Sequence, residues 1–88
     1  MTERVRILEL FAEAQRLVAD SERHLFEQRE RLAKLERDGH DTGEARRRLT
    51  EIEERLKHHA EDLEGARRAL AALPEAGAPP DRTVDPTP

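Results

Sequence analysis

The chain has 88 residues, of which 35% are hydrophobic and 41% charged, so it forms at most one small domain without a large enclosed core. Its formal net charge of −4 gives it no general attraction to phosphate backbones or anionic lipid, and the absence of Trp and Tyr removes the usual stacking platforms for bases and sugars. The absence of Cys excludes disulfides, thiolate metal sites and thiol nucleophiles.

The first predicted element is a helix over about residues 3–38. Thr2 is an acceptable N-cap, and Glu3 in the first turn favours the positive end of the helix. Two series of residues repeat every seven positions and together form one stripe, as in a coiled coil. This predicted seam consists of Ile7, Phe11, Ala14, Val18, Ser21, Leu25, Gln28, Leu32 and Leu35.

The segment "LERDGHDTG" carries the signals that end this helix. Gly39 can adopt the left-handed conformation, which makes Asp38 the C-cap. A contact between Leu35 and His40 then closes a Schellman motif. We therefore expect the first helix to stop at this glycine.

A start signal for a second helix follows directly. Asp41 can cap that helix, and Glu44 lies three residues later, at the capping-box offset. The connection is then only residues 39–41, so the two helices must run antiparallel. The alternative is a cation site in this turn, but its oxygens lack the regular spacing of a calcium loop. We interpret the segment as a turn.

The second predicted helix covers about residues 42–73. Its seam residues step by four and three without a break, and they are Ala45, Leu49, Ile52, Leu56, His59, Leu63, Ala66, Leu70 and Leu73. Pro74 ends the helix because it lacks the backbone donor and its ring clashes with the preceding turn. Residues 74–88 contain five prolines and few apolar side chains, so we expect a disordered tail.

The sequence thus predicts an all-α, coiled-coil-like antiparallel hairpin over residues 1–73. Folding about the turn should place Glu36 opposite Arg46 and Arg29 opposite Glu53, which are attractive pairs. A single seam in a chain of this size stabilises weakly, and the first helix has further apolar residues near its N-terminal half. We therefore expect a homodimer that forms a four-helix bundle. The expected interaction surface consists of Leu8, Leu10, Phe11, Leu17, Val18 and Phe26.

The stretch "LERDGHDTGEARRRLTEIEERLKHH" resembles a group of short alphaproteobacterial proteins with an "ERDGHDT" turn between two Leu-rich helical segments. The resemblance covers about the middle third of the chain and is most specific at the turn. It implies a helical hairpin of bacterial cytoplasmic origin. The function of that group is unknown, so the resemblance assigns no catalytic residue.

A metal-binding bundle is the main alternative to an interaction module. Its ligands would be His24, His58 or His59, with Glu27 and Glu61. Di-iron bundles place Glu three residues before His, whereas this chain has the reverse order, so we expect no metal and no cofactor.

Nucleic-acid binding is the third alternative. The successive arginines at 46–48 point about 100° apart on a helix, so they do not form one basic patch.

No catalytic constellation is visible in the sequence. Charges at Glu9 and Glu13 interrupt the N-terminal apolar run, so we expect neither a signal peptide nor a membrane segment there. We expect a cytoplasmic, non-enzymatic interaction, regulatory or structural module that contacts itself or a partner protein, without nucleic acid or membrane.

Overall fold

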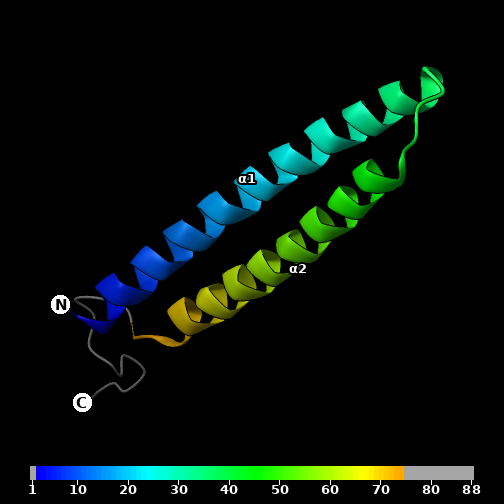
Figure 1. The fold of residues 1–88 in the computed structure, drawn as a ribbon. Helices are drawn as coiled ribbons and strands as arrows, with labels where there is room; N and C mark the ends of the chain where they lie inside the picture. Colours follow the sequence, from blue (N-terminus) through cyan, green and yellow to red (C-terminus); the bar gives the residue numbers. More distant parts are fainter. Residues whose placement is uncertain (1, 75–88) are drawn as a thin grey trace, which may run out of the picture.

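A computed structural model describes residues 2–74 of the chain as two helices, α1 (Glu3–Arg37) and α2 (Gly43–Ala72). The helices lie side by side and antiparallel, joined at one end by a tight connection (Figure 1). These described residues contain no strand. The predicted all-α hairpin is therefore confirmed, while the predicted disorder of the tail lies outside the described residues beyond Pro74.

The helix ends are set by local signals in the sequence. The Thr2 hydroxyl accepts a hydrogen bond from the Val5 backbone N–H at 3.2 Å, and Glu3 lies in the first turn. Lys34 and Arg37 lie in the last turn of α1, where their positive charges interact favourably with the negative end of the helix dipole. At the end of α2, Leu73 is extended, as expected for a residue before proline.

The seam between α1 and α2 contains the residues that the spacing predicts. Leu25 and Ile52 are buried, with 8% and 9% of their surfaces exposed, and the polar Ser21 is only 3% exposed. Ile7, Ala14 and Ala45 are also buried. The remaining predicted seam residues are half-buried: Phe11, Val18, Gln28, Leu32, Leu35, Leu49, Leu56, His59, Leu63, Ala66, Leu70 and Leu73.

Two ion pairs across the seam fix how the helices align. Arg46 Nη2 lies 2.6 Å from Glu36 Oε2, and Arg29 Nη2 lies 3.8 Å from Glu53 Oε2. The position numbers in each pair add to 82, as the hairpin register predicts. At the open end of the hairpin, the Arg4 guanidinium donates a hydrogen bond to the Pro74 carbonyl.

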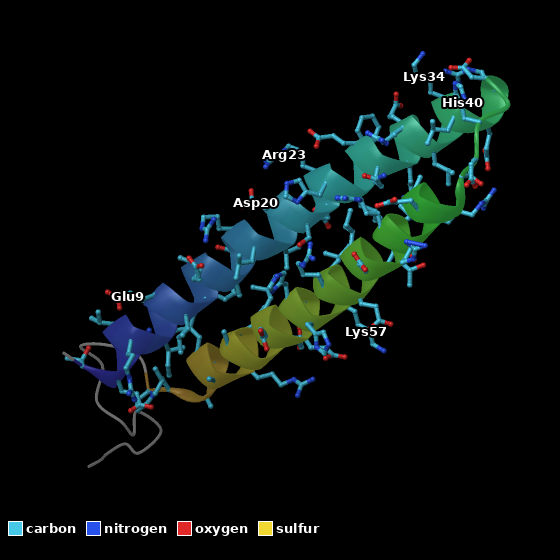
Figure 2. All side chains as sticks on the ribbon, in the orientation of Figure 1. Glu9, Asp20, Arg23, Lys34, His40 and Lys57 are labelled. Atoms are coloured by element: carbon cyan, nitrogen blue, oxygen red, sulfur yellow. The ribbon has the colours of Figure 1, made fainter. Side chains whose placement is uncertain are left out.

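Charged side chains cover the outer surfaces of both helices, where Asp20 and Arg23 point away from α2 and Lys57 points away from α1 (Figure 2). Most of the ion pairs lie within one helix, as where Arg16 contacts both Glu13 and Asp20. Such exposed pairs contribute only ~0.3–0.5 kcal/mol each. Stability therefore depends mainly on the seam, and no described side chain is completely buried in it.

The helix boundaries differ slightly from the prediction. α1 ends at Arg37 rather than 38, and α2 begins at Gly43 rather than 42 and ends at Ala72 rather than 73. The connection is thus residues 38–42 instead of 39–41, because of the hydrogen bonds in the turn.

Candidate functional site

The first half of the turn is a Schellman motif. Gly39 has φ +74°, the left-handed region that favours glycine. The His40 backbone N–H donates to the Leu35 carbonyl at 3.0 Å, and the Gly39 N–H donates to the Glu36 carbonyl at 3.2 Å. Asp38 is the C-cap, as the sequence predicts. These bonds satisfy carbonyls at the end of α1 without any ligand.

The second half of the turn differs from the predicted capping box. Thr42, not Asp41, is the N-cap residue of α2, and its side chain makes no cap hydrogen bond. Asp41 Oδ1 instead accepts from the Gly43 N–H at 3.0 Å, two residues on, which forms an Asx-turn. Glu44 lies 3.9 Å from Arg48 and does not complete a capping box with Asp41. The prediction that Asp41 caps α2 with Glu44 is therefore wrong.

The histidines of the metal alternative do not converge. His24 and His58 are exposed, and His59 is half-buried at the seam. His58 Nδ1 lies 3.9 Å from Glu61 Oε1, but both side chains are mostly exposed. Glu27 is exposed on α1. Among residues 2–74, no group of three or more His, Asp or Glu side chains is placed to hold a metal ion.

The six residues of the expected interaction surface do not form one face. Phe11 and Val18 are half-buried in the seam against α2, so they are not available as a free surface. Leu10 is 60% exposed, and Leu8 is 43% exposed. Leu10 directly precedes a seam position and Leu8 directly follows one, so the two lie on opposite sides of the seam. Leu17 is half-buried on the same side as Leu10, about two turns further along α1.

Phe26 belongs to a different surface, which we call the outer stripe of α1. The outer stripe consists of Val5, Ala12, Ala19, Phe26 and Ala33, which are spaced seven residues apart and are all exposed. Phe26 is 63% exposed and Val5 41%. A spacing of seven keeps all five on one face of the helix, and their exposure shows that α2 does not cover it. Sequence reasoning noted most of these residues as apolar but missed their common period.

A second feature that sequence reasoning missed is a groove of about 830 Å³ beside the turn. It is lined by residues of both helices, including Gln28 and Arg31 of α1 and Arg55 of α2. All three side chains are hydrogen-bond donors: the two arginines lie on one side of the seam and Gln28 lies in the seam itself. Arg31 directly precedes the seam residue Leu32, and Arg55 directly precedes the seam residue Leu56. This shared position in the repeat could have placed both arginines on the same side of the seam from the sequence alone.

The perturbed ionisable groups lie on the helix surfaces rather than at a site. The Arg16 guanidinium hydrogen-bonds to Glu13 and lowers the pKa of that carboxyl, and the same contact raises the pKa of Arg16. Hydrogen bonding by Arg67 likewise lowers the pKa of Glu64. Glu13 and Arg16 are exposed, Glu64 is half-buried, and each is paired within its own helix, so the shifts reflect ion pairs along the helices.

Comparison of the chain with protein-family models, curated protein sequences and solved structures finds no match. The resemblance of the turn to alphaproteobacterial proteins therefore stays a prediction. Within the described part of the chain, neither helix is long and apolar enough to cross a membrane. The function must be inferred from the exposed surfaces of the hairpin.

Proposed function

We propose that the hairpin is a non-enzymatic interaction module that forms a homodimer through the outer stripe of α1. Two hairpins joined in this way make a four-helix assembly. The observation that carries the proposal is an exposed apolar residue at every seventh position of α1 from Val5 to Ala33. We place the module in the cytoplasm, a setting with which the cysteine-free sequence is compatible.

The thin seam supports self-association. Only five hydrophobic residues are buried in the hairpin, and the chain is close to the size below which one core rarely supplies more than ~3–5 kcal/mol. Covering Phe26, which is 63% exposed, would add about 1–2 kcal/mol per copy if a fully buried Phe contributes about 1.5–3 kcal/mol. A second hairpin therefore adds stability comparable with that of a large part of the seam.

The size pattern of the outer stripe fits a second copy in the antiparallel direction. When Ala19 faces its symmetry mate, Phe26 faces Ala12 of the other copy and Val5 faces Ala33. Each large side chain then meets a small one, which allows the helices to approach closely. The pattern is self-complementary, as a two-fold interface requires.

The charges beside the outer stripe are compatible with this arrangement. Arg16 lies 2.6 Å from Glu13 and 3.1 Å from Asp20, and Arg23 lies 3.3 Å from Asp20. These arginines are neutralised by carboxylates of their own helix, so their repulsion across a two-fold axis is reduced.

Sedimentation velocity at micromolar concentration tests the proposal. We expect a dimer for the natural chain and a monomer for Phe26→Glu, because a carboxylate would have to be desolvated in the interface. Leu10→Glu is the matched control, since Leu10 is exposed to a similar degree, 60%, but lies off the outer stripe. A monomeric natural chain, or a dimer that survives Phe26→Glu and is lost in Leu10→Glu, would contradict the proposed interface. Circular dichroism should show equal helix content for all three proteins.

A further inference from the structure

The groove beside the turn differs in charge from the opposite side of the seam. On that opposite side, Arg29 faces Glu53 and Glu36 faces Arg46, so each cation has a carboxylate across the seam. The groove side is lined by four basic residues, Arg31, Lys34, Arg48 and Arg55, and by three acidic ones, Glu27, Asp38 and Glu51. We call this surface the basic groove.

The hairpin register brings like charges together at the basic groove. Arg31 directly precedes the seam residue Leu32, and Arg55 directly precedes the seam residue Leu56. In an antiparallel pair, positions of this kind face each other across the seam. Among the described residues, neither Arg31 nor Arg55 forms an ion pair with a carboxylate. Glu27 and Glu51 lie one helical turn before Arg31 and Arg55 and line the same groove, but neither forms an ion pair with these arginines.

A buried amide at the same place also has no partner. Gln28 Nε2 is shielded from solvent and forms no hydrogen bond within residues 2–74, and Gln28 lines the basic groove together with the two arginines. The groove therefore offers exposed N–H donors from Arg31 and Arg55 and one covered donor from Gln28. An acceptor oxygen from outside the hairpin would satisfy the guanidiniums directly, and the Gln28 amide would have to turn outward to reach it.

We propose that the basic groove binds an acidic helical segment of a partner protein. Its carboxylates would accept hydrogen bonds from Arg31 and Arg55, since the guanidinium fork matches a carboxylate in two-point contact. An apolar residue of the same segment would pack on Leu35 and Ile52, which also line the groove. The α1 wall of the groove runs from His24 to Asp38, about 21 Å, which matches about four turns of a partner helix.

Other occupants fit the groove less well. Glu27, Asp38 and Glu51 also line it and would repel the continuous charge of a nucleic acid. A second copy of the hairpin would place arginine against arginine if the two grooves met. An acidic protein segment can instead space its carboxylates to meet the arginines and avoid the acidic side chains.

Fluorescence anisotropy with a labelled helical peptide of Ala, Leu and spaced Glu residues tests the proposal at low salt. We expect binding by the full chain that weakens at least tenfold in Arg31→Glu and in Arg55→Glu. Lys57→Glu is the matched control, because it makes the same charge change on the outer side of α2, where Lys57 points away from α1 (Figure 2), and it should weaken binding less than twofold. Absence of binding, equal losses in all three variants, or tighter binding of a duplex DNA probe would overturn the proposal.

Thermal melting supplies a readout that does not depend on the probe. Arg55→Glu places a carboxylate opposite Arg31 and should raise the Tm by about 2–6 °C, whereas Lys57→Glu should not. A lowered Tm in Arg55→Glu would show that the two arginines do not oppose each other. The basic groove and the outer stripe use different residues, so Phe26→Glu should bind the acidic helical peptide as the natural chain does, even if it abolishes the dimer.

Discussion

Replacement of Gly39 by alanine tests whether the turn depends on backbone conformation alone. Gly39 has φ +74°, and a Cβ built at this position would meet nothing within 4 Å. The cost of Gly39→Ala is therefore conformational and not steric. Holding an alanine in the left-handed region costs about 1–2 kcal/mol. For a domain of this size, each kcal/mol shifts the Tm by about 4–8 °C, so we expect a fall of about 4–16 °C.

Gly65→Ala is the matched control for this substitution. Gly65 lies inside α2 and has open space around its Cα, so an added methyl group creates no clash. Alanine is the better helix former by about 0.8–1 kcal/mol, and Gly65→Ala should raise the Tm by several degrees. The two Gly-to-Ala changes thus act in opposite directions. Thermal unfolding followed by circular dichroism measures both, and an unchanged or higher Tm for Gly39→Ala would refute the account of the turn.

Three further experiments test the seam and the charge pairs. Ile52→Ala should destabilise the hairpin by about 2–4 kcal/mol in urea unfolding, because Ile52 is 9% exposed at the seam, and a loss below about 1 kcal/mol would contradict its burial. A double-mutant cycle on Glu36→Gln and Arg46→Met should give a coupling of about 0.2–1 kcal/mol that disappears in high salt, and no coupling at low salt would refute the register. An NMR titration should show the Glu64 pKa below its usual value because of the Arg67 hydrogen bond. The contribution of this hydrogen bond to the stability of the folded hairpin is then fully present at pH values above the ordinary carboxyl pKa, and it is lost as the pH falls through the lowered pKa. Arg67→Ala should raise that pKa again, and an unchanged value would show that another group causes the shift.

The hairpin itself was predictable because the seam repeats without interruption. The spacing of four and three residues places the polar Ser21 and Gln28 on the seam, and both are covered there despite their polarity. The same spacing predicted that Glu36 faces Arg46, which the structure confirms at 2.6 Å. The position of a residue in the seven-residue repeat therefore predicts its burial and its partner across the seam better than the hydrophobicity of that residue does.

The start of α2 could not be fixed from the sequence. Asp41 and Thr42 are both good N-cap residues, and a shift by one residue exchanges a capping box for an Asx-turn of similar energy. The structure places Thr42 at the cap and leaves Asp41 bonded to Gly43. Only the three-dimensional path of the turn distinguishes these alternatives.

The candidate surfaces were missed for two other reasons. Ala12, Ala19 and Ala33 are weakly hydrophobic, so the outer stripe is less conspicuous than the seam although its period is the same. At the basic groove, a search for attractive pairs across the seam passes over Arg31 and Arg55. Repulsive pairs in a predicted register are equally informative, because they mark the places where a partner can supply the missing charge.

Disulfide cross-linking of Ala19→Cys tests the proposed homodimer most directly. The natural chain has no cysteine, so any disulfide formed under mild oxidation must join two copies through this position. In the antiparallel dimer Ala19 faces its symmetry mate, and we expect rapid, nearly complete formation of a covalent dimer that keeps its helix content. Preferential cross-linking of Leu10→Cys, with Ala19→Cys remaining monomeric, would contradict the interface.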